Sequence, residues 1–192
     1  MPPINRYGLA TLSEGIDALT AAALGLAAWR SPSAQQLIAL VGSAVLLAVG
    51  VVLLVVVERD GYQVLQIGNW EAPFGITLVA DLFSSILIVL TGVLAVAIVL
   101  YSTATIDCRR ERFAYYPLTM VLLAGVAGTF LTGDLFNLYV WFEVLLIASF
   151  VLLALGGERA QLEGALKYVA LNLVASAVLL VTIGFIYGLT GT

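Results

Sequence analysis

Two ionisable side chains interrupt the apolar runs of this 192-residue sequence, and proton transfer is the chemistry they allow. Glu143 is the one charged residue between Asp134 and Glu158, and Lys167 is the last charged residue of the chain. On a helix, Glu143 would lie about 13 Å from Asp134 and about 18 Å from Leu155, near the middle of a bilayer. A carboxyl group there is either protonated or ionised against a buried cation or water chain. Such a group can carry protons; the alternative is a neutral glutamic acid that hydrogen-bonds between helices.

Lys167 allows two interpretations of equal weight. It follows Arg159 and Glu163 at successive spacings of four residues, so a surface row of ion pairs explains it without transport. Its long side chain can also reach water from the end of a helix. A functional lysine within the membrane is the other interpretation.

A polar stripe continues along the segment that contains Lys167. It comprises Tyr168, Asn172 and Ser176, which recur every four residues and therefore share one helix face. These side chains are suited to line a wet path for protons or ions. The neighbouring Ala175 and Ala177 equally suit close packing of small residues between helices.

Two further carboxylates stand directly before apolar runs. Asp134 precedes Leu135 and Asp81 precedes Leu82, the position where a side chain caps a helix and meets its positive dipole end. Each is predicted to be a cap, with a carboxylate at the mouth of an ion path as the alternative. Gly125 and Gly128 are predicted to permit close helix contact rather than to bind a ligand.

The elements that position these residues are transmembrane helices. Apolar residues make up 62% of the chain, charged residues 10%, and the mean hydropathy is +1.09. About 20 apolar residues cross a bilayer, so the sequence predicts an all-α integral membrane protein with six helices. Their predicted ranges, within a single transmembrane domain 1–192, are 16–29, 37–57, 82–105, 117–132, 135–155 and 164–189.

Several classes of site and partner are excluded by composition. The chain has no histidine and one cysteine, Cys108, so the common Cys/His metal sites lack ligands and no cofactor is expected. A net charge of −4 is opposite to the basic surface that binding of nucleic acid requires. No nucleophile stands beside a base, so we expect a transporter component in contact with membrane lipid rather than an enzyme.

Loop charges predict the orientation. Most arginines fall in the connections after the first, third and fifth predicted helices, which places those connections in the cytoplasm and both termini outside. The first predicted helix is short, with Glu14 just before it and Asp17 at its start, so the sequence does not fix how deeply it enters the membrane. On the exterior side, residues 58–74 alternate apolar and polar around a Gly-Asn pair and predict a small β-hairpin on the membrane surface, with Tyr62 and Trp70 at the interface.

Three stretches carry a resemblance to a known family. They read GNWEAPFGITLVADLFSSIL (68–87), GDLFNLYVWFEVLLIASFVLLALGG (133–157) and RAQLEGALKYVALNLVASAVLLVTIGFIYGLTGT (159–192). Over about residues 37–192 the chain resembles the D subunits of Mrp-type multisubunit Na⁺/H⁺ antiporters. It is also similar, less closely, to the proton-pumping antiporter-like subunits of respiratory complex I and of membrane-bound hydrogenases.

The resemblance implies an Mrp-type subunit that exchanges Na⁺, or another monovalent cation, for H⁺ in a bacterial plasma membrane, beside A, B, C, E, F and G-type subunits. By motif, Glu143 matches the family's essential intramembrane glutamate and Lys167 the lysine of its LKY motif. An ionised Glu143 would then hold a lysine charged, and the arrival of a proton would weaken that pairing. Glu143 and Lys167 are thus the expected proton-translocation residues.

Two departures from the family accompany the resemblance. Family members carry roughly twice as many helices, so we expect this chain to represent the N-terminal portion of the antiporter-like fold, truncated relative to the family. The lysine on the seventh helix that pairs with the glutamate is absent. The alternatives are a proton-pumping subunit of a complex I-like or hydrogenase assembly, and a structural membrane subunit that has no transport role.

Overall fold

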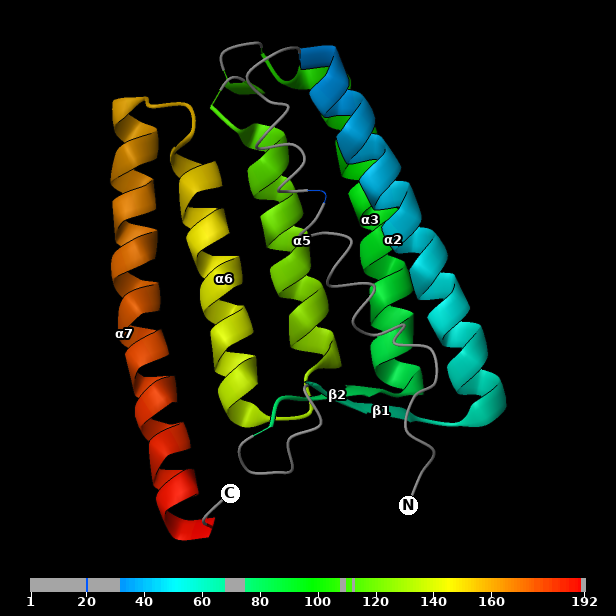
Figure 1. Ribbon diagram of the computed structural model, residues 1–192. Coiled ribbons are helices and arrows are strands. Elements are labelled where there is room, and N and C mark those ends of the chain that lie inside the picture. The colour runs from blue at the N-terminus through cyan, green and yellow to red at the C-terminus, as the bar shows by residue number, and fades with distance from the viewer. Residues whose placement is uncertain (1–19, 21–31, 68–74, 108–109, 112, 191–192) are drawn as a thin grey trace.

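Long helices joined at their ends by short connections make up the computed structural model, which describes residues 20, 32–67, 75–107, 110–111 and 113–190. Figure 1 shows the helices lying side by side, with a two-stranded sheet across one end. The helices are α2 (Pro32–Asp60), α3 (Leu82–Thr105), α5 (Tyr115–Leu131), α6 (Leu135–Ala154) and α7 (Arg159–Thr190).

Four of these helices, α2, α3, α6 and α7, are long and apolar enough to cross a membrane, while α5 is a shorter apolar helix of 17 residues. The predicted class, an all-α integral membrane protein with a small β-hairpin, is confirmed. The expected first helix, 16–29, lies outside the described residues apart from Thr20.

The observed helices extend past the predicted apolar runs. Helix α2 begins at Pro32 rather than at residue 37, and α7 begins at Arg159 rather than at residue 164. Hydropathy locates the part of a helix that suits lipid, whereas the helix itself can continue through polar turns beyond that part. Two such turns contain Gln35, which is buried, and Glu163, which is exposed.

The hairpin joins β1 (Gln63–Gln66) to β2 (Thr77–Ala80) in antiparallel register, with Gln63 opposite Ala80. The second strand lies beyond the predicted segment 58–74, of which residues 68–74 are outside the described ranges. Leu78 and Ala80 are buried against α2, α3 and α5, so the hairpin is anchored on the helix ends. That burial selects the register, because a shift of one residue would turn both side chains outward.

Glycines set the close approaches between helices. A Cβ added at Gly125 of α5 would lie 2.9 Å from the backbone nitrogen of Leu145 on α6. A Cβ at Gly128 would meet the indole ring of Trp141, also on α6. The predicted helix contact at these two glycines is confirmed, and it fixes which face of α6 turns towards α5.

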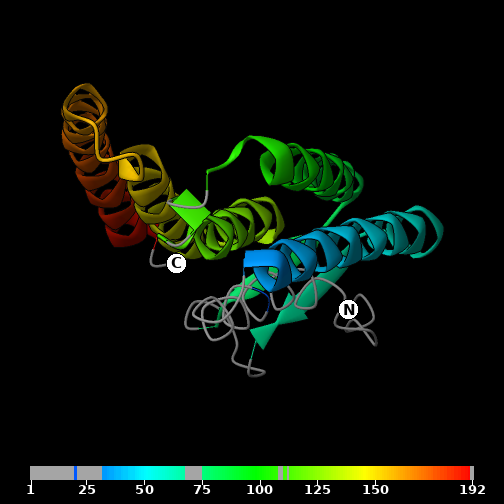
Figure 2. The same cartoon turned by 90° about the horizontal axis from the view of Figure 1, so that it is seen from above.

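Helix α7 occupies the edge of the described structure. Viewed from above, α5, α6 and α7 follow one another in a row, with α7 at the end (Figure 2). Helix α6 lies between the other two, and most of α7 is exposed. The residues that face α7 from α6 therefore form the last helix interface of the described chain, and Glu143 lies there.

Candidate functional site

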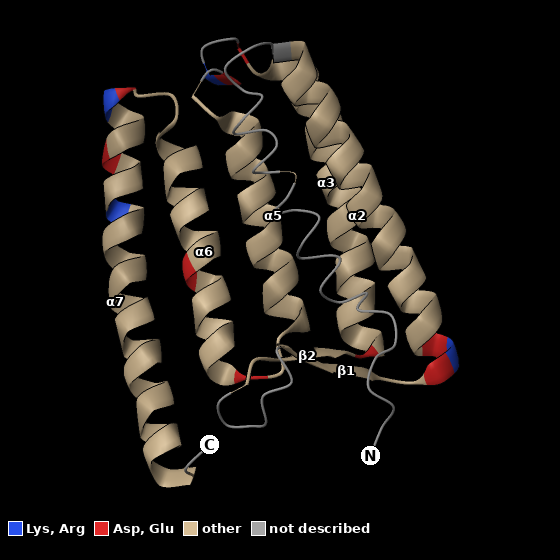
Figure 3. Ribbon diagram, in the orientation of Figure 1, with Lys and Arg blue, Asp and Glu red and all other residues tan. Residues whose placement is uncertain are grey.

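Glu143 lies part-way along α6, away from the helix ends where most charged residues gather (Figure 3). Its Oε1 atom accepts a hydrogen bond from the Ser176 hydroxyl of α7. Both side chains are half-buried. The structure thus brings together two predicted site residues that are 33 positions apart in the sequence.

The pairing of α6 with α7 is antiparallel and has a definite register. Seven residues after Glu143, the ring of Phe150 packs edge-on against the ring of Tyr168, with centroids 5.5 Å apart. Tyr168 lies eight residues before Ser176, so one face of each helix runs along the other. The same face of α6 therefore carries both Glu143 and Phe150.

Lys167 is not brought to Glu143. It precedes Ser176 by nine residues, which corresponds to about 13 Å along the axis of α7. Its Nζ lies 2.7 Å from Oε1 of Glu163, and these two side chains are 72% and 65% exposed. The ion pair expected on local grounds is present, and a direct bond between Glu143 and Lys167 is not.

The predicted polar stripe lies partly along the α6–α7 interface. Ser176 and Tyr168 both contact α6. Asn172, four residues from each of them, is half-buried and donates from Nδ2 to the carbonyl oxygen of Tyr168 at 2.8 Å. The stripe leads from Glu143 towards the level of Lys167.

The two carboxylates before helices act as caps. Asp134 Oδ1 accepts from the backbone N–H groups of Phe136 and Asn137, at 2.8 and 3.0 Å. Asp81 forms a reciprocal capping box with Ser84 at the start of α3. The Ser84 N–H bond, 2.7 Å long, lowers the pKa of the Asp81 carboxyl below 3.8, against the opposing effect of burial.

One buried carboxylate escapes sequence reasoning. Glu111 stands in an arginine-rich run between α3 and α5, which predicts solvent exposure, yet it is 4% exposed. Its Oε1 accepts from Nε2 of Gln36 at 2.7 Å. No spacing rule connects two residues 75 positions apart, so only the tertiary structure identifies this pair.

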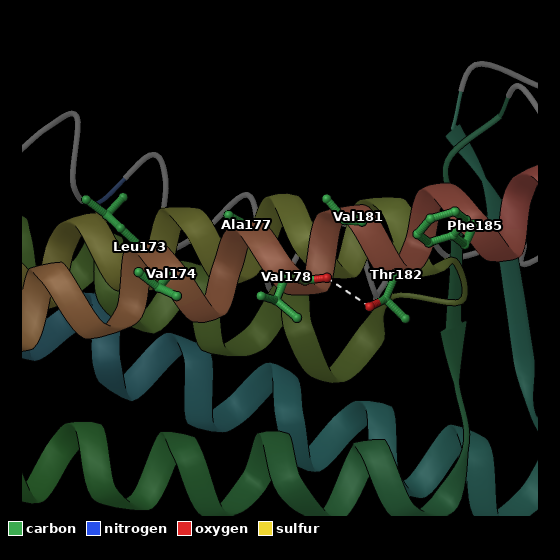
Figure 4. A pocket seen from close by; sticks show the side chains of 7 residues that line it. All are labelled: Leu173, Val174, Ala177, Val178, Val181, Thr182 and Phe185. Atoms are coloured by element: carbon green, nitrogen blue, oxygen red, sulfur yellow. Dashed lines mark hydrogen bonds between the residues drawn. The ribbon is translucent and has the colours of Figure 1, made fainter.

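A shallow apolar hollow on α7 offers no polar group to an ion (Figure 4). Its one hydroxyl, Thr182 Oγ1, is bonded to the carbonyl of Val178 at 2.8 Å. Within the described ranges no group of three or more acidic, cysteine or histidine residues could hold a metal ion. The residues lining the hollow are Leu173, Val174, Ala177, Val178, Val181, Thr182 and Phe185.

Sequence comparison finds relatives among the subunits of cation/proton antiporters. Residues 132–192 match the family described as NADH:quinone oxidoreductase/Mrp antiporter, transmembrane. The chain is 49% identical to the D subunit of the Na⁺/H⁺ antiporter of Alkalihalophilus pseudofirmus over 147 residues, 77% of this chain and 30% of the relative. Identity to the corresponding D subunit of Bacillus subtilis is 47% over 150 residues, with 78% and 30% covered. The D subunit of a probable K⁺/H⁺ antiporter of Rhizobium meliloti is 46% identical over 69% of this chain and 24% of its own length.

Solved structures share the fold. A chain of the Mrp complex from a Dietzia species superimposes with a TM-score of 0.87 and 29% identity, covering 96% of this chain and 35% of that one. A chain of an archaeal membrane-bound sulfane sulfur reductase gives a TM-score of 0.90 and 26% identity, covering 95% and 38%. This chain spans about a third of the length of these proteins. Sequence and fold together identify it as a relative of the D subunits of Mrp-type antiporters.

Proposed function

We propose that the chain is a membrane subunit of a multisubunit cation/proton antiporter and that Glu143 is its proton-carrying group. The hydrogen bond between Glu143 and Ser176 carries this proposal, because it joins a carboxylate deep in one apolar helix to the polar stripe of the next. The relatives named as D subunits of antiporters, at 47–49% identity, support the same activity.

Ser176 gives Glu143 two stable states. The ionised carboxylate accepts a hydrogen bond from the Ser176 hydroxyl. The protonated acid can instead donate a hydrogen bond to that hydroxyl or to water. A proton can therefore pass between the helices without moving either backbone. Asn172 and Tyr168 extend the path along α7, so the proton route follows this stripe.

Lys167 acts at a distance in this mechanism. Two unit charges about 13 Å apart interact by roughly 1 kcal/mol at an effective dielectric constant of about 20. Because Lys167 is largely exposed and paired with Glu163, solvent and that ion pair weaken its effect on Glu143 further. Movement of the Lys167 ammonium group away from Glu163 would strengthen it.

The membrane setting and the partners belong to the same assignment. We place the subunit in a bacterial plasma membrane, with the arginine-rich helix ends in the cytoplasm and the β-hairpin outside. Other Mrp-type subunits would cover the exposed faces of α6 and α7, and Na⁺ or another monovalent cation would exchange for H⁺. The names of the relatives and of the Mrp complex support a place among other antiporter subunits.

The test is cation-driven proton movement in vesicles that contain the full assembly. With an imposed pH gradient and no respiratory substrate, adding Na⁺ or K⁺ should collapse the gradient when this chain is present. Vesicles from a strain lacking the chain, with the other subunits retained, provide the control. Equal responses from both preparations would reject the transport role and leave a structural subunit.

A redox-driven proton pump is the second candidate. The fold match to a chain of a sulfane sulfur reductase favours it, because that chain superimposes at least as well as the Mrp chain. The higher sequence identity to antiporter subunits favours exchange. Proton movement that requires an electron donor, and that added cations leave unchanged, would decide for the pump.

A further inference from the structure

Helix α3 presents a surface of its own, apart from the α6–α7 site. We propose that the outward face of α3 is a lipid-contact surface, covered in the assembled complex by acyl chains and not by another subunit. This lipid stripe comprises Phe83, Ile86, Leu90, Leu94, Ala97 and Tyr101. These residues recur at spacings of three or four and therefore share one face of the helix. The stripe goes beyond the proposed transport function, since α3 and α7 lie on opposite sides of α5 (Figures 1 and 2).

The lipid stripe is exposed along its length. Phe83 and Tyr101, at its two ends, are 71% and 72% exposed, and Leu94 between them is 60% exposed. The opposite face of α3 packs against α2 and α5, and Ile88 and Ala95 are buried there. The core therefore fixes the rotation of α3 about its axis, and the stripe points away from the other described helices.

Side-chain size separates the two faces of α3. Helices that meet within a membrane do so through small residues, because lipid tails are as apolar as large side chains and only close packing favours association. The buried face follows this rule with Ser85, Gly92 and Ala95, and a Cβ added at Gly92 would lie 2.7 Å from the Cα of Leu47 on α2. In the stripe, Ala97 is the one small residue, and the others are aromatic or long aliphatic side chains. Fluid acyl chains fit such a surface better than a partner helix does.

The length of the stripe matches the hydrocarbon core of a bilayer. Phe83 and Tyr101 are eighteen positions apart, which corresponds to about 27 Å along a helix. The hydrocarbon core is about 30 Å thick. Tyrosine favours the boundary between acyl chains and water, and exposed carboxylates, Asp81 and Asp107, flank the stripe on its two sides. The stripe therefore begins and ends where a lipid-facing surface must.

Polar groups of α3 avoid the stripe over this length. The hydroxyls of Ser85, Thr91 and Ser102 lie on the buried face, and each donates to a backbone carbonyl three or four residues earlier, at 2.7–2.8 Å. No charged residue stands between Asp81 and Asp107 in the sequence. A path for water or ions needs polar side chains, which the stripe lacks between its ends, so hydrocarbon is the occupant that its chemistry fits.

Spin labels test the stripe in the assembled complex reconstituted in lipid vesicles. Single cysteines are introduced in a Cys108→Ser background as Leu90→Cys and Leu94→Cys on the stripe, Ala95→Cys on the buried face and Thr105→Cys beyond Tyr101. Each nitroxide label reports its collisions with molecular oxygen, which concentrates in hydrocarbon, and with a nickel chelate, which stays in water. We expect the labels at residues 90 and 94 to collide with oxygen several-fold more often than the label at residue 95. The label at residue 105 should collide with the nickel chelate several-fold more often than the labels at residues 90 and 94.

Two outcomes overturn the proposal. Oxygen collisions at residues 90 and 94 that are as rare as those at residue 95 would show that protein covers the stripe. Nickel collisions at residues 90 and 94 that are as frequent as those at residue 105 would show a surface in contact with water. Neither measurement depends on transport, so a failure of the lipid stripe is distinct from a failure of the role proposed for Glu143.

Photocrosslinking keeps the test decisive if the variant at the buried Ala95 does not assemble. A photoreactive benzoylphenylalanine replaces Leu94, whose exposed position leaves room for the larger side chain. After irradiation of the assembled complex, we expect crosslinks from this residue to lipid alone. A crosslinked band that joins this chain to another subunit rejects the lipid stripe.

Discussion

Glu143 of α6 accepts a hydrogen bond from Ser176 of α7, nine residues beyond Lys167, which the family resemblance implies as the second proton-translocation residue. The two helices are held in this register by the contact of Phe150 with Tyr168. A mechanism built on a direct bond from Glu143 to Lys167 is therefore incompatible with this packing. In the proposed mechanism the Ser176 hydroxyl is the near partner of Glu143, and Lys167 acts only through its electrostatic field.

Ser176→Ala should slow transport by about tenfold. A hydrogen bond to a charged group contributes about 1.5 kcal/mol, which is close to a factor of ten in rate. Ser176→Thr is the matched control, since it retains the hydroxyl at the same position. Initial rates of cation-driven proton movement in vesicles measure both. Wild-type rates for the alanine variant would show that Ser176 only packs against α6.

Lys167→Gln should reduce transport by at most a few-fold, because the charge that it removes is exposed and acts on Glu143 only through a screened field. Glu163→Gln is the control. It breaks the same surface ion pair and leaves the lysine charged. Its transport should equal or exceed that of wild type. If both variants transport at the wild-type rate, Lys167 belongs to a surface ion pair alone.

Gly125→Ala should destabilise the chain by about 1–3 kcal/mol, because the added Cβ would press on the backbone of Leu145 and force α5 from α6. Gly184→Ala, on α7, is the matched substitution, as nothing in the described structure lies within 4 Å of its Cβ position. Denaturant unfolding of the purified assembly compares the two. If both variants lose a similar amount of unfolding free energy, the close contact between α5 and α6 is contradicted.

Asp81→Ala should lower the free energy of unfolding by about 1 kcal/mol near neutral pH, because the N-cap of α3 is lost. The pKa of Asp81 is lower in the folded chain, so its ionised form stabilises the fold above pH 3.8, and that contribution disappears as the pH falls through the lowered pKa. Asp81→Asn keeps a capping oxygen that does not titrate. Denaturant unfolding should therefore find wild type more stable than Asp81→Asn near neutral pH and equally stable in acid. A stability difference that does not depend on pH would contradict the role of the charge.

Much of the fold follows from local sequence. The apolar runs and the caps at Asp81 and Asp134 each depend on residues near one another in the chain, and small residues at Gly125 and Gly128 predicted a close contact that forms with the next helix, α6. The position of β2 at residues 77–80 did not follow, because its register depends on burying Leu78 and Ala80 against distant helices. Hairpin rules expect the turn to bring neighbouring segments together.

The candidate site was predictable in composition but not in pairing. A lone carboxylate in an apolar helix identifies Glu143, and the recurrence of polar residues identifies the stripe that includes Ser176. Which stripe residue meets Glu143 depends on how far α7 slides along α6, and sequence spacing within one helix carries no information on that. Glu111 shows the same limit, since its arginine neighbours predict exposure and its tertiary contacts bury it.

The most direct test of the central claim is transport by Glu143→Gln and Glu143→Asp in the assembled complex. Glutamine keeps the size and the hydrogen bond to Ser176 but cannot carry a proton, so cation-driven proton movement should be abolished. Aspartate can carry a proton but is one methylene shorter, so transport should be reduced and its pH dependence altered. Transport at the wild-type rate and pH dependence in both variants would contradict the account.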